Sequence, residues 1–395
     1  EDCARDYCWV TELGEEAVAH AHGRLLRRLP AIGPSLVAWN SLAWARNHLA
    51  GLPWSEALDS LQLLDAEGRP LARQVVAGDD GEPRLLWALP GVPSLGYRAY
   101  ALVSCQPPLA AALTVTPTLL ENQFFRLELN ERGQIASLWD KRCSRQVLAP
   151  GARGNILQAF EDKPLDFDAW DIDIYYLEKM VEVDDLVEAT VEETGPVRGT
   201  LRLTWRFYDS TVSQRLSMYA HSPRIDFRCE VNWQERQVLL KAAFPVNVRS
   251  RKATYDIQFG NLERPAHWNT EWDVARFEVA GHKWVDLSEG NYGVALLNDC
   301  KYGYDVRDGV LRLTLLKSAI DPDPEADRGR HVFTYSLLPH AGGWREGGVG
   351  AEAYALNHPL GADLLPGAQA GDLPSAYSFA WLDEGAGHVI LETVK

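Results

Sequence analysis

The chain has 395 residues, of which 46% are hydrophobic and 24% are charged, a composition typical of ordinary globular proteins. Its formal net charge of −16 argues against nucleic acid and anionic membranes as partners, because both attract basic patches. No apolar run approaches the roughly 18 residues of a membrane span, no N-terminal signal segment is visible, and the six cysteines form no CxxC pair. We therefore expect two or three domains, a cytoplasmic location with reduced thiols, no membrane partner, and a neutral or cationic ligand.

Residues 1–29 are predicted to form one amphipathic helix, which Pro30 ends. The apolar and small side chains that recur at spacings of three and four are Tyr7, Val10, Gly14, Ala17, Ala21, Leu25 and Leu29. A lone amphipathic helix needs a packing partner, and no second long helical pattern follows, so we expect that partner to lie outside this chain. His20 and His22 do not share a helix face and are expected to be solvated or packed rather than to bind a metal.

From Pro30 onward the pattern changes to short strands separated by Pro and Gly, which predicts a small β-sandwich over residues 30–117. The β-rich segments are 35–44, 60–64, 74–76, 85–89 and 97–103. The Pro-rich stretch 106–117 is predicted to be a linker.

Longer and more numerous strands follow from Thr118, among them a long strand predicted over residues 177–192. Runs such as RIDFRCEVNW (224–233) alternate polar and apolar residues, which is typical of a half-exposed strand. Because helical patterns are nearly absent, residues 118–395 are predicted to form a large antiparallel β-sandwich. The segment 340–375 is rich in Gly, Ala and Pro, and 376–394 is predicted to be strands that stop without a capping turn, so we expect the natural chain to continue.

The stretch FEDKPLDFDAWDIDIYY, residues 160–176, combines six acidic residues with five aromatic ones. A buried strand would not carry so many unpaired carboxylates, and a solvated loop would not need so many rings. Carboxylates bind sugar hydroxyls and aromatic faces bind the CH face of a sugar ring, so the stretch suggests a surface segment that faces a sugar. The alternative is an irregular crossover whose acids are solvated and whose rings plug the end of a sandwich.

Two other regions concentrate polar and aromatic residues: RPAHWNTEWDVARFEVAGHKW (264–284), and NDCKYGY (298–304) with LKSAIDPDPEADRG (316–329). Glycosidases use two carboxylates, but no spacing in this chain selects a pair. The sequence carries no dinucleotide fingerprint, P-loop, GxSxG or HExxH motif. From the residues alone, the chain is predicted to be a β-sandwich protein with a sugar-facing end.

Four strings carry a more specific signal: NQFFRLELNERGQIASLWDK, EDKPLDFDAWDIDIYY, HWNTEWDVARFEVAGHKWVDLSEGNYGVALLNDCKYGYDV and FTYSLLPHAGGWREGG. They resemble the α-mannosidases of glycoside hydrolase family 38, in the branch shared by bacterial and cytosolic or vacuolar enzymes, and the resemblance covers nearly the whole chain. It implies a mainly β fold in which the last helix of a helical bundle, a small β-sandwich and a large galactose-mutarotase-like antiparallel β-sandwich follow one another.

The same resemblance implies a metal-dependent retaining α-mannosidase. The family's zinc is held by a His-x-Asp pair, by the Asp nucleophile and by a His in an HDxLPGSS-like motif, and this chain carries none of these motifs. We therefore assign it no catalytic residue and no metal ligand, and expect zinc or another divalent metal only in the full-length enzyme. The implied function is the carbohydrate-facing C-terminal half of the enzyme, inactive alone, which acts on mannose-containing oligosaccharides. Its own N-terminal catalytic domain is the expected partner, and we expect a homo-oligomer formed through exposed apolar surface.

In the family, a loop of the large sandwich reaches the edge of the active site. The candidate sugar-binding residues, in order of preference, are Asp168, Trp170 and Asp171, then His267, Trp268 and Asn269, then Lys317 with the PDPEAD loop. Core packing is the expected role of the remaining Trp and Tyr residues.

Two alternatives stay open at this point. The chain could be a self-standing carbohydrate-binding or interaction module. It could also be a mutarotase-like epimerase, which needs a histidine acid and a carboxylate base on one sheet face. His267, His282 or His331 could supply the acid, although no spacing supports such a pair.

Overall fold

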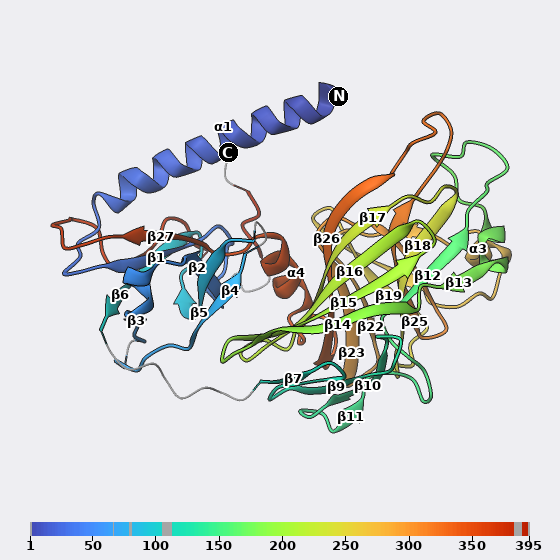
Figure 1. Ribbon diagram of the computed structural model, residues 1–395, viewed down its shortest axis with the longest axis horizontal. Helices are drawn as coiled ribbons and strands as arrows, with labels where there is room; N and C mark the ends of the chain where they lie inside the picture. Colours follow the sequence, from blue (N-terminus) through green and yellow to red (C-terminus); the bar gives the residue numbers. More distant parts are fainter. Residues whose placement is uncertain (1, 66, 79–80, 105–112, 383–388, 394–395) are drawn as a thin grey trace. The chain divides into compact units, whose positions relative to one another are not determined.

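The computed structural model describes residues 2–65, 67–78, 81–104, 113–382 and 389–393. The chain divides into two compact units: unit 1 contains Glu1–Leu109 and His358–Lys395, and unit 2 contains Ala110–Asn357. Antiparallel strands dominate both units (Figure 1), which confirms the predicted mainly β chain with an N-terminal helix. Within the described residues, no helix is long and apolar enough to cross a membrane.

The predicted N-terminal helix is present as α1 (Asp2–Leu26). Only its C-terminal end packs against the rest of unit 1, where the His22 ring stacks on Trp39 at 4.0 Å and His22 Nδ1 lies 2.9 Å from Asp363 Oδ2. Apolar side chains nearer its N-terminus are solvent-exposed, with Tyr7 74% and Val10 60% accessible. The helix thus presents an apolar face that nothing covers within the described part of unit 1.

Unit 1 is a small sandwich of two sheets, one with strand order β27-β1-β6-β28 and β3 paired to β6, the other with order β2-β5-β4. Its elements are β1 (Ser35–Asn40), β2 (Arg46–Pro53), α2 (Glu56–Asp59), β3 (Gln62–Leu63), β4 (Arg73–Ala77), β5 (Pro83–Val92), β6 (Gly96–Val103), β27 (Gly361–Leu365) and β28 (Ala376–Ser378). In β1, Leu36 and Ala38 pack in the core that also contains residues of β2 and β5, whereas Val37 and Trp39 belong to a second cluster with Leu29. Both faces of β1 are therefore buried.

The C-terminal segment belongs to unit 1, which differs from the prediction that residues 118–395 form one sandwich. Strand β27 pairs with β1 and β28 pairs with β6, so both extend the first sheet. The cause is non-local strand pairing, which satisfies backbone groups at open sheet edges. The strands predicted over 376–394 are reduced to β28 among the described residues there, and 383–388 and 394 lie outside them.

Unit 2 contains sheets of nine, six and five strands. The nine-stranded order β14-β15-β16-β17-β26-β23-β22-β19-β20 comprises β14 (Asp185–Thr194), β15 (Arg198–Phe207), β16 (Ser210–Tyr219), β17 (Ile225–Trp233), β19 (Lys252–Ile257), β20 (Gly260–Pro265), β22 (Trp284–Ser288), β23 (Tyr292–Asn298) and β26 (Gly329–Ala341). The six-stranded order β13-β12-β18-β25-β24-β21 comprises β12 (Ile156–Glu161), β13 (Met180–Glu182), β18 (Val238–Pro245), β21 (Val279–Ala280), β24 (Gly303–Arg307) and β25 (Val310–Lys317). The remaining sheet comprises β7 (Thr114–Thr116), β8 (Leu119–Glu121), β9 (Phe125–Leu129), β10 (Ile135–Asp140) and β11 (Arg145–Gln146).

Three local predictions differ from the structure of unit 2. The predicted linker 106–117 contains strand β7, while 106–112 lie outside the described residues. The predicted long strand 177–192 is divided among a short 3₁₀ helix, η1 (Ile174–Glu178), and strands β13 and β14. An α-helix, α4 (Val349–Asn357), occupies part of the Gly- and Ala-rich segment and packs its buried residues on a small cluster with Trp284.

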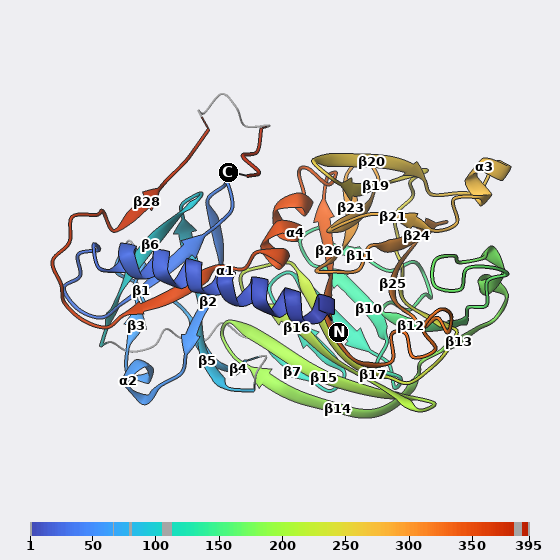
Figure 2. The same cartoon turned by 90° about the horizontal axis from the view of Figure 1, so that it is seen from above.

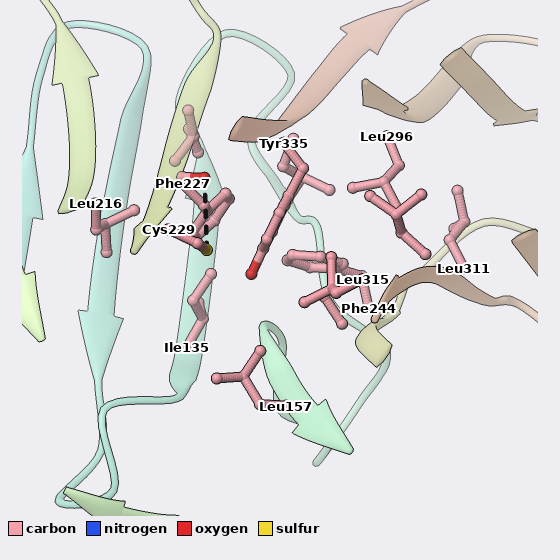
Figure 3. Packing of buried hydrophobic residues seen from close by; sticks show 14 of the residues in the cluster. Ile135, Leu157, Leu216, Phe227, Cys229, Phe244, Leu296, Leu311, Leu315 and Tyr335 are labelled. Atoms are coloured by element: carbon pink, nitrogen blue, oxygen red, sulfur yellow. Dashed lines mark hydrogen bonds between the residues drawn. The ribbon is translucent and has the colours of Figure 1, made fainter. Parts of the chain in front are cut away.

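The core of unit 2 joins its sheets through aromatic contacts (Figure 3). Phe227 and Tyr335, on neighbouring strands of the nine-stranded sheet, stack at 5.0 Å, and Phe244 of β18 lies 5.7 Å from Phe227. The buried Tyr335 hydroxyl donates to Asn155 Oδ1 at 2.6 Å and accepts from Gln214 Nε2 at 2.8 Å. Asn155 Nδ2 donates to Gln214 Oε1 at 2.7 Å, so the three polar side chains satisfy one another inside the apolar core.

This closed triangle yields a stability prediction. Tyr335→Phe should lower the free energy of unfolding of unit 2 by about 1–3 kcal/mol, because it removes two buried hydrogen bonds and leaves Asn155 Oδ1 without its donor. Tyr208→Phe is the control, since that side chain is 71% exposed, and should change stability by less than about 0.5 kcal/mol. Urea denaturation of the three proteins measures the effect, and equal stabilities would contradict it.

Candidate functional site

The acidic and aromatic stretch forms a loop, 162–173, between β12 and η1, and its two ends are anchored in the core. Phe160 at the end of β12 and Tyr176 in η1 are both buried and meet edge to face at 5.0 Å. They share a hydrophobic cluster with Leu239 of β18. The rings at the two ends therefore pack as a structural base, and the residues between them extend from it.

Two aspartates bind this loop to the end of β25 and to the segment that follows it. The Lys317 ammonium pairs with the carboxylate of Asp162, which is 2% exposed. The Ile320 backbone N–H donates to Asp168 Oδ2 at 2.6 Å. The structure thus brings together the first and third groups of predicted residues, Asp168 and Lys317. Each of these two aspartates also has a buried oxygen, Oδ1, that has no hydrogen-bond partner among the described residues.

Trp170 and Asp171 lie at the exposed tip of the loop. The N–H groups of both donate to the Phe167 carbonyl, at 2.8 and 2.9 Å, and Phe167 has a φ of 53° in the left-handed region. The Trp170 side chain is 71% exposed, so its ring does not plug the sandwich and is accessible for stacking on a ligand.

Neighbouring carboxylates at the start of the loop have opposite pKa shifts. Burial raises the pKa of Asp162 despite the Lys317 ion pair, and the charges of Asp168 and Asp173 add to the rise. Hydrogen bonds from Lys163 and Lys179 lower the pKa of Glu161 to about 2. The fold thus disfavours ionisation of Asp162 and favours ionisation of Glu161. This fits the structure, because one oxygen of Asp162 has no hydrogen-bond partner among the described residues.

The predicted triplet His267, Trp268 and Asn269 is divided between two hollows. His267 and Asn269 line an open groove with the residues that follow β18. Trp268 lines a separate pocket with Tyr176, and the Arg307 guanidinium lies over its ring at 3.8 Å. The triplet therefore does not act as one cluster, but Trp268 shares a pocket with the end of the acidic and aromatic stretch.

A buried ionic cluster beneath that pocket was missed by sequence reasoning. Lys241 of β18 is fully buried, and its ammonium pairs with Glu278 and, at 2.7 Å, with Asp305 Oδ2. The Tyr176 hydroxyl donates to Glu278 at 2.6 Å, and Arg312 donates to Asp305 at 2.6 Å. Burial, and then the Glu278 charge, raise the pKa of Tyr176. The available signal was a single lysine in the apolar run VLLKAAFP.

Two negative observations concern the metal site and the three histidines named for an epimerase, and both apply to the described residues. No group of three or more of their His, Cys, Asp and Glu side chains converges so that it could hold a metal ion. His267 and His331 lie against backbone carbonyls, and His282 lies 3.4 Å from Gln258 Nε2. None of these three histidines pairs with a carboxylate in the described structure.

The raised pKa of Asp162 predicts a pH dependence of stability. Because the folded carboxyl keeps its proton to a higher pH than the unfolded one, the folded state binds more protons just above the ordinary value of 3.8. The contribution of Asp162 to the free energy of unfolding should therefore fall as pH rises through that window. The difference in unfolding free energy, wild type minus Asp162→Asn, should become larger as the pH is lowered from about 7 to about 4.

Urea denaturation at a series of pH values measures this difference. Asp171→Asn controls for the removal of a negative charge from the same loop. A difference between wild type and Asp162→Asn that shrinks on acidification would show that the folded state favours the ionised carboxylate.

Comparison with known proteins gives one consistent result. The family model described as "Glycosyl hydrolases family 38 C-terminal domain" matches residues 120–325. Alpha-mannosidase 2C1 of Homo sapiens is 37% identical over 410 residues, which cover 98% of this chain and 36% of the relative. Alpha-mannosidase 2C1 of Mus musculus is 41% identical over 407 residues, which cover 100% and 36%. The chain thus spans about a third of the length of these relatives.

Solved structures agree on the fold. The crystal structure of an alpha-mannosidase from Enterococcus faecalis V583 superposes with a TM-score of 0.74 over 92% of this chain and 50% of that one. At 15% sequence identity, this likeness concerns the fold alone.

Proposed function

Because this chain belongs to glycoside hydrolase family 38, we propose that it is the carbohydrate-facing C-terminal region of a metal-dependent retaining α-mannosidase that hydrolyses terminal α-mannosides. The observation that carries the proposal is that relatives named as α-mannosidases match it along 98–100% of its length. The proposed substrates are mannose-containing oligosaccharides, and the proposed location is the cytoplasm.

The catalytic nucleophile and the divalent metal, in this proposal, are supplied by residues outside these 395. Two observations support this: the chain matches 36% of each relative's length, and its described residues do not fit a metal site. The exposed apolar face of α1 is the surface on which we propose that the catalytic domain, or another subunit of a homo-oligomer, packs.

The role that we propose for this chain follows from the difference between the held base and the exposed tip of the 162–173 loop. The Asp162–Lys317 pair and the Asp168–Ile320 hydrogen bond hold the base of the loop, while Trp170 and Asp171 remain exposed. A rigid base with an exposed ring and carboxylate can position a sugar, because the ring stacks on it and the carboxylate accepts from its hydroxyls. We propose that Trp170 and Asp171 contact the substrate and that Asp168 positions them.

The first test is activity of the chain alone. The purified 395-residue chain should not hydrolyse an aryl α-mannoside above background, with or without added zinc or cobalt. Metal-dependent turnover by this chain would place the nucleophile within it and contradict the proposal. Specific binding of mannosides by a chain that never takes part in hydrolysis would favour the self-standing binding module.

The second test concerns the tip of the loop in the natural protein that contains this chain. Trp170→Ala and Asp171→Asn should lower kcat/KM for α-mannosides on the order of tenfold to a hundredfold, as expected for the loss of one charge-assisted or stacking contact. Both side chains are exposed, so the melting temperature should stay nearly constant. Asp168→Asn should lower both stability and kcat/KM, because it weakens the anchor at Ile320.

Tyr175→Ala is the matched control for Trp170→Ala, since Tyr175 is a neighbouring exposed aromatic residue. Its kcat/KM should stay within about twofold of the wild type. An unchanged kcat/KM in Trp170→Ala, together with a lowered melting temperature, would show that the loop is structural.

A further inference from the structure

A pocket of unit 2 carries more positive charge than its own acids can balance. It lies among the elements β20, β21, β24 and α3 (Glu271–Val274), which Figure 2 shows at one end of unit 2. The charged residues that line it are Arg264, Asp273, Arg276, Asp305, Arg307 and Arg312. Four arginines thus face two aspartates, in a protein whose net charge is −16.

Both aspartates are already engaged by other groups. Asp305 accepts from Lys241 at 2.7 Å and from Arg312 at 2.6 Å, and Lys241 also pairs with Glu278. These four charges form a neutral set of two cations and two anions. Asp273 takes part in the N-terminal capping box of α3, where its Oδ2 accepts from the backbone N–H groups of Asn269 and Thr270, each at 3.1 Å.

Two guanidinium groups remain without an acid partner. Arg264 lies over the Tyr255 ring at 4.6 Å, and its Nη1 is buried with no hydrogen-bond partner among the described residues. Arg276 lines the same pocket, and no described carboxylate lies within ion-pair distance of either group. Burial, and then the charge of Arg276, lower the pKa of Arg264 despite the neighbouring Tyr255, so the two cations are close enough to repel one another.

Arg264 is half-buried, its buried Nη1 has no acceptor among the described residues, and a second guanidinium lies beside it, so an anion between the two groups would be stabilising. Arginine presents a planar fork of donors that matches the oxygens of a carboxylate or a phosphate. The Trp268 ring is covered on one face by Arg307 and is 36% exposed, so it offers a flat apolar surface at the same pocket. A ring attached to the bound anion can lie against that surface.

We propose that this pocket binds the oxyanion of a charged sugar, a carboxylate or a phosphate group, between Arg264 and Arg276, with the sugar ring against Trp268. The Lys241 cluster below it holds β18, β24 and Glu278 in place and does not take part in binding. Binding at this site does not depend on the proposed mannosidase activity.

Isothermal titration calorimetry on the purified chain tests the proposal with four probes: inorganic phosphate, mannose 6-phosphate, glucuronate and neutral mannose. At least one of the two charged sugars should bind at least tenfold more tightly than mannose, and its affinity should fall as salt is added. Binding of mannose 6-phosphate alone identifies a phosphate site, and binding of glucuronate alone identifies a carboxylate site. Equal affinities for charged and neutral sugars, or binding of inorganic phosphate without either charged sugar, would overturn the proposal.

Substitutions locate the site. Arg264→Gln and Arg276→Gln should each weaken binding of the charged sugar at least tenfold, as expected for the loss of a charge-assisted hydrogen-bond donor. Arg330→Gln is the control, because Arg330 is an exposed arginine of β26 outside the pocket, and it should leave the affinity unchanged.

Arg276 is itself exposed, so Arg276→Gln should fold normally even if Arg264→Gln does not, and circular dichroism checks this. Unchanged affinity in a folded Arg276→Gln variant would refute the assignment. Failure of the mannosidase tests would leave these titrations unaffected, so the two proposals can fail separately.

Discussion

A fully buried ammonium group organises the functional end of unit 2. Lys241 sits in the middle of an apolar strand, where an unpaired charge would be strongly destabilising, so two carboxylates must stay beside it. Glu278 reaches it from the segment after α3, and Asp305 from β24. Tyr176 adds a hydroxyl from the end of the acidic and aromatic stretch. One charge on β18 thus joins η1 and the segment before β21 to β24 of the same sheet, and both the 162–173 loop and the arginine pocket are built on these elements.

Burial and ion pairing also separate the rigid groups from the accessible groups along the 162–173 loop. Buried rings and an ion pair fix its two ends, while its tip presents an indole and a carboxylate to solvent. Binding residues on a fixed base lose less conformational entropy on contact with a ligand than residues on a free loop. The two interpretations that residue composition left open, a sugar-facing surface and a structural plug, therefore apply to different residues: Trp170 is exposed, and Phe160 and Tyr176 pack inside.

Local pattern predicted much of the fold, and long-range pairing accounts for most of what it did not predict. The period of apolar residues located α1 and most strands, because these depend on neighbours in sequence. The assignment of β27 and β28 to unit 1 depends on sheet edges formed by β1 and β6, which no local pattern reports. Likewise, no spacing shows that Lys241 meets Glu278 and Asp305, or that His267 and Trp268 line different hollows.

The return of the chain to its first sheet has a consequence for synthesis on the ribosome. The edges of β1 and β6 emerge early, but the strands that cover them, β27 and β28, are translated only after the whole of unit 2. Unit 2 has all its strands in one continuous stretch and can fold as soon as that stretch has emerged. The N-terminal unit is therefore the later one to be completed, and until then its open edges need protection from pairing with other nascent chains.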